Sequence, residues 1–216
     1  MKRADVFINC HFSDDYRDFF NAIVFTIVRS GFVPRCALEL NDGAVNRFEK
    51  ICKIIEDCSY GVHDISKTEL DKRSGLPRFN MPLELGVFLG AKRFGNKNQS
   101  KKKCIIFDRA QYRFQKFLSD IAGQDISSHK KSRNKLIREL AAWLRNELRV
   151  RKIPGGVAIA REYSKFITEL PEICAELDLE PKELTFKDFG LMISSWIARA
   201  PRRIVKTSKP ARSAAM

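Results

Sequence analysis

The sequence predicts an α/β fold in which a small, doubly wound parallel sheet carries a helical C-terminal extension. Four short apolar segments rich in β-branched and aromatic residues alternate with segments whose apolar residues recur at helical spacing. This alternation is typical of β-α-β units, whose right-handed crossovers give a parallel sheet covered by helices on both faces. After the fourth apolar segment the chain keeps only the helical spacing.

The predicted strands are residues 5–10, 32–38, 59–65 and 103–108. Pro34 cannot donate a backbone hydrogen bond, so we expect the second strand to be irregular or at an edge of the sheet. The helices predicted between the strands are residues 16–30, 45–58 and 81–92. Gly31 follows the first helix, where it acts as a stop signal, and Pro82 is tolerated in the first turn of the third.

Beyond the fourth strand, we expect helices at residues 112–121, 131–149, 157–170, 171–177 and 186–197, with Thr185 capping the last one. The chain then divides into three parts. Residues 1–126 form the α/β domain, residues 127–198 form a helical extension packed on it, and residues 199–216 form a basic tail. This tail has six basic residues and no acidic one, which is typical of a disordered segment.

Composition and charge restrict the class of partner. Of the 216 residues, 44% are hydrophobic and 31% are charged, as in an ordinary folded protein, and the net charge is +14. The excess of Lys and Arg attracts phosphate groups, although such runs are more often a solvated face. The basic clusters lack interleaved aromatic residues, so we do not expect nucleic acid as a partner.

The six cysteines show no CxxC pair and histidine is scarce, so we expect no metal site and interpret the thiols as small buried hydrophobes. Asp5 lies two positions after the basic pair Lys2 and Arg3, which is unlike a secretory signal. No apolar stretch is long enough to cross a membrane. These features predict a protein of the reducing cytoplasm.

Polar residues follow each predicted strand, at the edge where a parallel sheet binds its ligands. The candidates are Asn9 at the end of the first strand with Phe12 and Asp14 in the loop after it, Arg35 near the end of the second strand, and His63, Asp64 and Ser66 at and just after the end of the third. His63, like His11, is either an acid–base group or a structural hydrogen-bonding residue. Arg35, Arg47 and Arg78 are candidates for binding phosphates, unless they are ordinary surface residues.

Glu84 is the main catalytic candidate because its neighbours Leu83, Leu85 and Val87 are apolar. A carboxylate in the first turn of an otherwise buried helix has two interpretations. It either interacts favourably with the helix N-terminus, or it faces the crevice and stabilises a cationic sugar carbon.

The segments DVFIN…FSDDY and VHDIS…RFNMPLELGVFLG carry a resemblance that covers residues 4–108. The first resembles the opening strand and loop of Toll/interleukin-receptor (TIR) domains. The second is similar to the Asp…Asn-x-x-x-Glu-Leu-Gly stretch of nucleoside 2-deoxyribosyltransferases and of bacterial TIR-like proteins predicted to bind nucleotides. The resemblance implies a flavodoxin/TIR-like sheet, with Glu84 as the catalytic carboxylate of N-glycosidic bond cleavage. It also implies that Asn80, Asp64, Phe12 and Asp14 contact the nucleotide.

The resemblance favours an enzyme that cleaves an N-glycosidic bond, with NAD as its substrate and no separate cofactor, acting in bacterial anti-phage defence. Nicotinamide is already a cationic leaving group, so one carboxylate suffices. The alternatives are a non-catalytic module that senses a nucleotide or cyclic nucleotide, and a scaffold that only binds proteins. TIR-like enzymes self-assemble, so we expect a homo-oligomer.

Overall fold

The computed structural model describes residues 4–39, 42–70, 74–148 and 153–199. Its centre is a five-stranded sheet in which every pairing is parallel and the strand order is β2-β1-β3-β4-β5. The strands are β1 (Asp5–Asn9), β2 (Val33–Arg35), β3 (Tyr60–Asp64), β4 (Lys103–Asp108) and β5 (Ile126–Ser128). The predicted α/β class and parallel sheet are therefore confirmed, and this strand order is that of a flavodoxin-like doubly wound fold.

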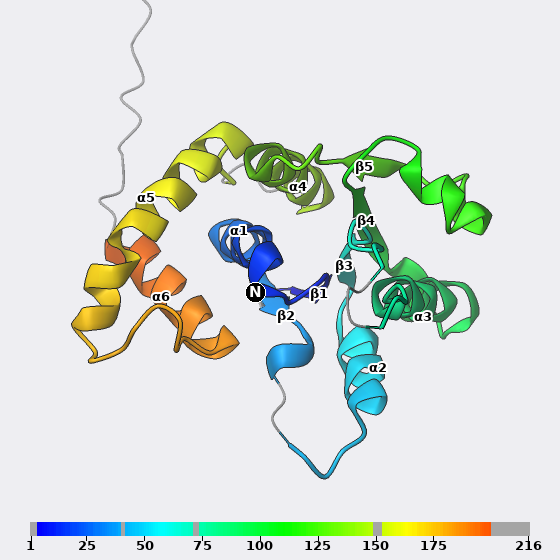
Figure 1. Ribbon diagram of the computed structural model, residues 1–216, viewed down its shortest axis with the longest axis horizontal. Coiled ribbons are helices and arrows are strands. Elements are labelled where there is room, and N and C mark those ends of the chain that lie inside the picture. The colour runs from blue at the N-terminus through cyan, green and yellow to red at the C-terminus, as the bar shows by residue number, and fades with distance from the viewer. Residues whose placement is uncertain (1–3, 40–41, 71–73, 149–152, 200–216) are drawn as a thin grey trace, which may run out of the picture.

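Helices cover both faces of the sheet (Figure 1). The α-helices are α1 (Arg17–Arg29), α2 (Arg47–Asp57), α3 (Asn80–Phe94), α4 (Arg133–Leu148), α5 (Gly156–Ala175) and α6 (Phe186–Arg199). Short 3-10 helices lie at η1 (Asp14–Tyr16), η2 (Ala37–Glu39), η3 (Gln99–Lys101), η4 (Arg113–Lys116) and η5 (Ser119–Ile121).

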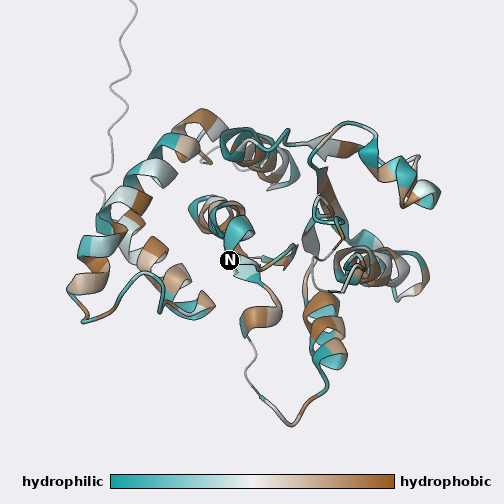
Figure 2. Ribbon diagram, in the orientation of Figure 1, coloured by the Kyte–Doolittle hydropathy of each residue, from teal (hydrophilic) through white to brown (hydrophobic). Residues whose placement is uncertain are grey.

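Alternation along the strands divides the core into two sides. Val6 and Ile8 pack in one large cluster with α1, α4, α5 and α6, whereas Phe7 between them packs with α2 and Phe88 of α3. Successive strand residues point to opposite faces, which accounts for this division. The strands are hydrophobic over much of their length, while the helices carry hydrophobic and hydrophilic residues side by side (Figure 2).

The C-terminal helices share the core of α1. Phe25 of α1 lies with its ring centroid 5.4 Å from those of Tyr163 and Phe166 in α5. The Tyr163 hydroxyl donates to the carboxylate of Asp18 at 2.8 Å, and Arg29 pairs with Glu162 at 2.6 Å. The division expected at residue 126 falls on the first residue of β5. The expected tail lies outside the described residues, apart from Arg199.

Three predicted elements are corrected. Residues 112–121 form η4 and η5 rather than an α-helix, and the chain enters η4 through Tyr112 at a positive φ of 57°. Apolar residues that are three positions apart lie on one face of a 3-10 helix as well as of an α-helix. Their spacing therefore predicted which face is buried, but it did not distinguish the two types of helix. The helices expected at 157–170 and 171–177 are one helix, α5, which continues through Pro171.

The strand β5 was not predicted because residues 124–129 are polar and the strand has only three residues. Its register pairs Ile106 with Ile126 and Asp108 with Ser128. The predicted edge position of the strand containing Pro34 is confirmed, because β2 is the outermost strand on its side.

Arg113 binds the segment after β3 to the end of β4. Its guanidinium donates to Asp108 Oδ1 at 2.7 Å, to the carbonyl oxygens of Ile65 and Ser66, and to Thr68 Oγ1 at 2.9 Å. The Asp108 side chain is fully buried, and its pKa is raised because burial outweighs the effect of Arg113. This ion pair therefore fixes where the connection to α3 begins.

Replacing Arg113 with Ala should lower the free energy of unfolding by about 3 kcal/mol, because it leaves the buried Asp108 carboxylate unpaired. Urea titration followed by circular dichroism measures the loss. The control is Arg17→Ala, which removes the exposed pair with Asp14 and should cost less than about 1 kcal/mol. Equal losses in the two variants would contradict this role for Arg113.

Candidate functional site

The carboxyl ends of the five strands gather polar and ionisable side chains at one edge of the sheet. Each strand contributes at its end: Asn9 and Cys10 after β1, Cys36 after β2, Asp64 and Ser66 after β3, Asp108 after β4, and Ser128 and His129 after β5. All of these residues are buried. Because the chain leaves β1 and β3 toward opposite faces, this edge holds the position where doubly wound sheets bind ligands.

Glu84 lies in the second turn of α3, on the side of the helix that faces the sheet. Its helix neighbours Met81, Leu85 and Phe88 are buried, while Glu84 itself is half-buried. Burial raises the pKa of Glu84 to about 7, and Arg47 at the start of α2 opposes this increase. Among the described residues, its carboxylate has no hydrogen-bond or ion-pair partner.

Two buried thiols show which strands Glu84 faces. Burial raises the pKa of Cys10 well above its usual value, with Asp64 and Glu84 among the charges that add to the effect. Burial likewise raises the pKa of Cys36 to about 12, again with a contribution from Glu84. Glu84 is therefore within electrostatic reach of the ends of β1 and β2, at the carboxyl edge of the sheet.

Asn9 connects β1, β3 and α3. Its side-chain amide donates to the carbonyl of Met81 at 2.8 Å and lies 3.0 Å from Nδ1 of His63. Since the amide nitrogen is the donor, His63 Nδ1 accepts and the ring proton is on Nε2. Asn9 thus fixes the first turn of α3 and, through it, the position of Glu84.

His63 is fully buried, and its ring lies edge-on to Phe7 and Phe88 on the side of the sheet covered by α2 and α3. Burial lowers its pKa to about 3, so the imidazole is neutral at physiological pH. A Cβ atom on Gly61 would lie 2.6 Å from His63 Nε2, so glycine at that position makes room for the ring. These contacts favour the structural interpretation of His63 over the acid–base one.

Asp64 forms a buried pair with His129. Nε2 of His129 lies 3.3 Å from Asp64 Oδ2, and both side chains are at most 3% exposed. His129 Nδ1 accepts the backbone N–H of Lys131 at 3.1 Å, so the other ring nitrogen, Nε2, is the one that faces the carboxylate. The other carboxylate oxygen accepts from the backbone of Ser66 at 2.8 Å, and the buried hydroxyl of Tyr16 lies beside Asp64.

The turn after β5, which carries the backbone N–H of Lys131, has a strained backbone. Lys130 and Lys131 have φ angles of 51° and 55°, in the left-handed region that side chains other than glycine rarely adopt. Each such residue costs about 1–3 kcal/mol and persists only where surrounding contacts fix it. The contact from Lys131 N to His129 Nδ1 is one of those contacts.

The other predicted site residues lie outside this buried group. Phe12 is half-buried and packs edge-on against Phe20 at 5.2 Å. Asp14 is exposed and pairs with Arg17, and Asn80 is exposed at the first position of α3. Arg35 is bound by the carboxylates of Glu39 and Asp5, chiefly Glu39, which raise its pKa further. Its guanidinium is therefore occupied by internal partners.

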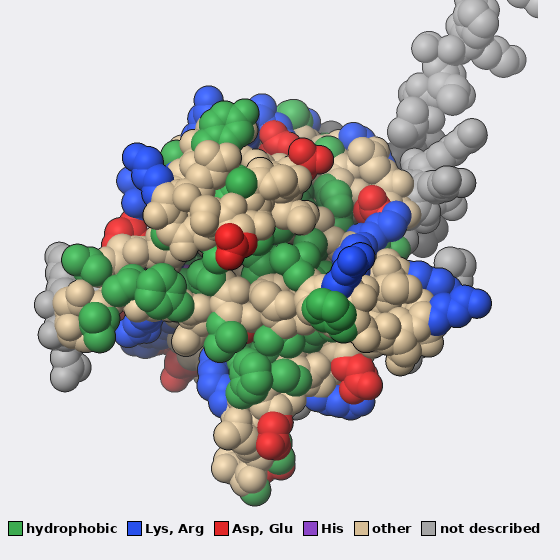
Figure 3. All heavy atoms as spheres, turned by 90° about the vertical axis from the view of Figure 1, so that its right-hand side faces the viewer, with side chains coloured by type: hydrophobic (Ala, Val, Ile, Leu, Met, Phe, Trp, Pro, Cys, Tyr) green, Lys and Arg blue, Asp and Glu red, His purple; other side chains and the backbone are tan. Residues whose placement is uncertain are grey.

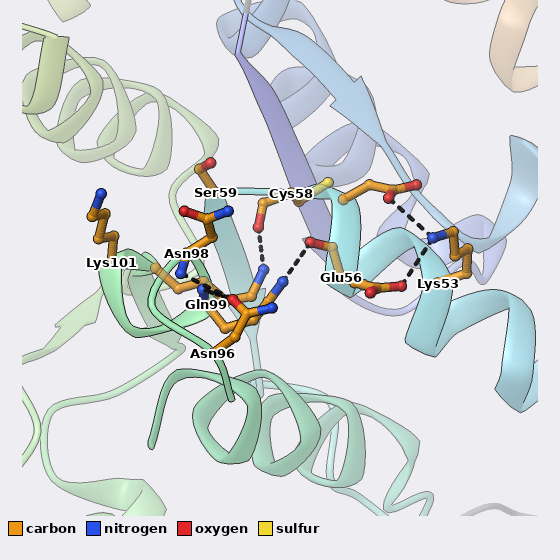
Figure 4. Close-up of a pocket in the computed structure, with 10 residues that line it drawn as sticks. Lys53, Glu56, Cys58, Ser59, Asn96, Asn98, Gln99 and Lys101 are labelled. Atoms are coloured by element: carbon orange, nitrogen blue, oxygen red, sulfur yellow. Dashed lines mark hydrogen bonds and ion pairs between the residues drawn. The ribbon is translucent and has the colours of Figure 1, made fainter. Parts of the chain in front are cut away.

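A shallow polar depression of about 460 Å³ lies at the opposite, amino edge of the sheet (Figure 4). It contains the C-terminal end of α2, whose carbonyl groups are capped by side chains. Lys102 Nζ donates to the carbonyl oxygens of Ile55 and Cys58, and Gln99 Nε2 donates to that of Glu56 at 3.0 Å. None of the predicted site residues lines this depression, and its buried lysine serves to cap α2.

No protein-family model matches the chain, and no curated protein matches it. Within the described ranges, no three His, Cys, Asp or Glu side chains are grouped so that they could hold a metal ion. No helix of those ranges combines the length and apolar character that crossing a bilayer requires.

His129 and Tyr16, which both lie beside Asp64, are not among the predicted site residues. His129 follows the unpredicted β5, so nothing in the sequence placed it beside Asp64. Tyr16 was interpreted only as part of an apolar helix stripe, and its hydroxyl is buried beside Asp64. His129 is brought to this edge by β5, whose Ile126 pairs with Ile106 of β4. A prediction of His129 at this edge would have required a prediction of β5.

Glu84→Gln should stabilise the fold at neutral and higher pH. The folded-state pKa of about 7 exceeds the reference value of 4.5, so the folded state binds more protons between these pH values. Stability from this group is therefore lost as the pH rises from about 4.5 to 7. Urea unfolding should show similar free energies for the two proteins near pH 4.5 and a more stable variant at pH 8.

The matched control is Glu49→Gln, which changes an exposed glutamate in the first turn of the neighbouring helix α2. At pH 8 its free energy of unfolding should differ from that of wild type by less than the difference for Glu84→Gln, because the side chain is exposed. A Glu84→Gln difference that is constant with pH would show that the carboxyl is not desolvated.

Proposed function

We propose that this protein is a TIR-like enzyme that cleaves an N-glycosidic bond, with NAD as its substrate, in bacterial anti-phage defence. One observation carries the proposal: Glu84 is a half-buried carboxylate without a partner among the described residues, located at the carboxyl edge of the sheet. An unpaired, partly desolvated carboxylate lowers stability, and side chains of this kind concentrate at functional sites.

The proposed reaction needs one negative group near the sugar carbon. As the bond from C1 of the ribose to the nicotinamide nitrogen breaks, the electron pair leaves with nicotinamide and positive charge develops on the ribose. The Glu84 carboxylate stabilises this centre or bonds to it transiently. Water then adds to C1 and loses a proton, so NAD and water give ADP-ribose, nicotinamide and a proton.

Charged groups near Glu84 suit a dinucleotide. The N-terminal ends of α2 and α3 both lie at the carboxyl edge, and helix N-termini attract phosphate. Arg47, at the first position of α2, is exposed and within electrostatic reach of Glu84. Among the phosphate-binding candidates, Arg47 is therefore better placed than Arg35, which is already paired.

The second candidate is a module that binds a nucleotide without cleaving it. A pKa of about 7 leaves much of the Glu84 carboxyl protonated at neutral pH, and a protonated carboxyl can donate a hydrogen bond to a base. Under this proposal the C-terminal helices pass the signal to partners.

We also propose a cytoplasmic homo-oligomer. All six cysteines are free thiols, which supports a reducing compartment. Self-assembly follows from the TIR-like resemblance, and size-exclusion chromatography with light scattering tests it.

Incubation of the purified protein with NAD should release nicotinamide, measured by liquid chromatography. Glu84→Gln should lower the rate by about 100-fold or more, because it removes the charge that stabilises the transition state. Glu49→Gln should retain the wild-type rate. Binding of NAD without any release by wild type would instead favour the sensing module.

The rate of NAD cleavage should rise with pH through about 7, since only the ionised Glu84 stabilises a cationic sugar. At pH 6, kcat/KM should be about a tenth of its plateau above pH 8. A rate independent of pH between 5 and 9 would show that the reaction does not use the ionised form of this carboxyl.

A further inference from the structure

Exposed apolar side chains are concentrated on the two chain segments that flank Glu84. Twelve large hydrophobic residues of the described ranges are exposed. Seven of them lie either from the end of β2 through the first turn of α2 or from the end of β3 through the first turn of α3. We call these seven the apolar rim: Leu38, Val45, Phe48, Leu70, Leu76, Phe79 and Leu83. Both segments leave the sheet at its carboxyl edge, and Figure 3 shows groups of hydrophobic side chains on the face that includes α3.

The packing of α2 on α3 places part of the rim beside the carboxylate. Ile51 of α2 and Phe88 of α3 belong to one buried cluster. Both helices follow parallel strands on the same side of the sheet, so they run in the same direction. One turn nearer their N-termini, Arg47 and Phe48 of α2 therefore lie opposite Glu84 of α3, which agrees with the electrostatic effect of Arg47 on Glu84.

Phe48 belongs to none of the three buried clusters formed by the described residues. It is the second residue of α2 and is 44% exposed, next to the exposed Arg47. Its backbone N–H is bound by the capping side chain of Asn46 at 2.8 Å, so its ring is not needed to begin the helix. Phe79, 55% exposed at the start of α3, is its counterpart on the other segment.

We propose that Phe48 determines specificity by stacking on the planar heterocyclic ring of the nucleotide whose sugar carbon faces Glu84. The inference rests on the proposed function for the identity of the ligand. Exposed aromatic rings stack readily on bases, and a ligand site combines such apolar surface with a few polar groups. Here the aromatic ring, the cation of Arg47 and the carboxylate of Glu84 match the heterocycle, phosphate and sugar of one nucleotide.

Calorimetric titration of the full chain tests this assignment, in a Glu84→Gln background so that NAD is not consumed. Phe48→Ala should weaken NAD binding about tenfold, and Phe48→Tyr should restore it because the ring is retained. Ribose 5-phosphate, which has no heterocycle, should bind equally to all three proteins. The control is Phe94→Ala, which changes a ring that is 86% exposed at the opposite end of α3 and should bind NAD normally.

Four results would overturn the inference. They are unchanged NAD binding in Phe48→Ala, an equal loss for ribose 5-phosphate, an equal loss in Phe94→Ala, and no binding of NAD at all. A change of oligomeric state in Phe48→Ala without a change in NAD affinity would mark the rim as a contact between copies, which also overturns it. Weakened NAD binding in Phe48→Ala, with no nicotinamide released by wild type, supports the stacking and rejects the proposed catalysis.

Discussion

The side-chain amide of Asn9 is the contact on which the arrangement of the carboxyl edge depends. One buried NH₂ group is shared between the Met81 carbonyl and the His63 ring, so β1, β3 and the first turn of α3 are held to one another. Satisfying two buried acceptors with one donor group is worth more than an exposed hydrogen bond, because each would otherwise be buried unpaired. Glu84 lies one helical turn beyond Met81, and its location follows from this connection.

Two carboxylates at the carboxyl edge, Asp64 and Glu84, differ in their hydrogen bonding and in their exposure to solvent. Asp64 accepts a hydrogen bond from the Ser66 backbone, lies 3.3 Å from the His129 ring, and is closed to solvent. Glu84 has no donor among the described residues and is only partly covered. Burial without compensation is costly for a charge. Asp64 is therefore suited to maintaining structure, whereas Glu84 is the group that an incoming positive centre can stabilise.

The sequence was sufficient for the fold class because hydrophobic spacing reports burial directly. Four of the five strands and the order of the first three α-helices followed from it. It failed for β5, where three residues are held by pairing with β4 rather than by their own propensity. It also failed for residues 112–121, where the apolar spacing was correct but the buried guanidinium of Arg113 and the left-handed Tyr112 accompany shorter turns.

For the site, sequence reasoning located Asn9, Asp64 and Glu84 at the correct edge, since parallel strands place their ends together. It could not show that Arg35 is paired with Glu39 or that the His63 ring lies in the core, because both depend on contacts between distant segments. Nor could it place His129 beside Asp64, because the two residues are far apart in the sequence.

The left-handed pair Lys130 and Lys131 has an evolutionary consequence. Glycine or asparagine at these positions would relieve the backbone strain, and a β-branched residue would increase it. Proteins descended from the same ancestor should therefore accept Gly, Asn or Lys at these two positions and exclude Val and Ile, immediately after the position of His129. A short pattern of this kind can reveal distant kinship where overall sequence similarity has faded.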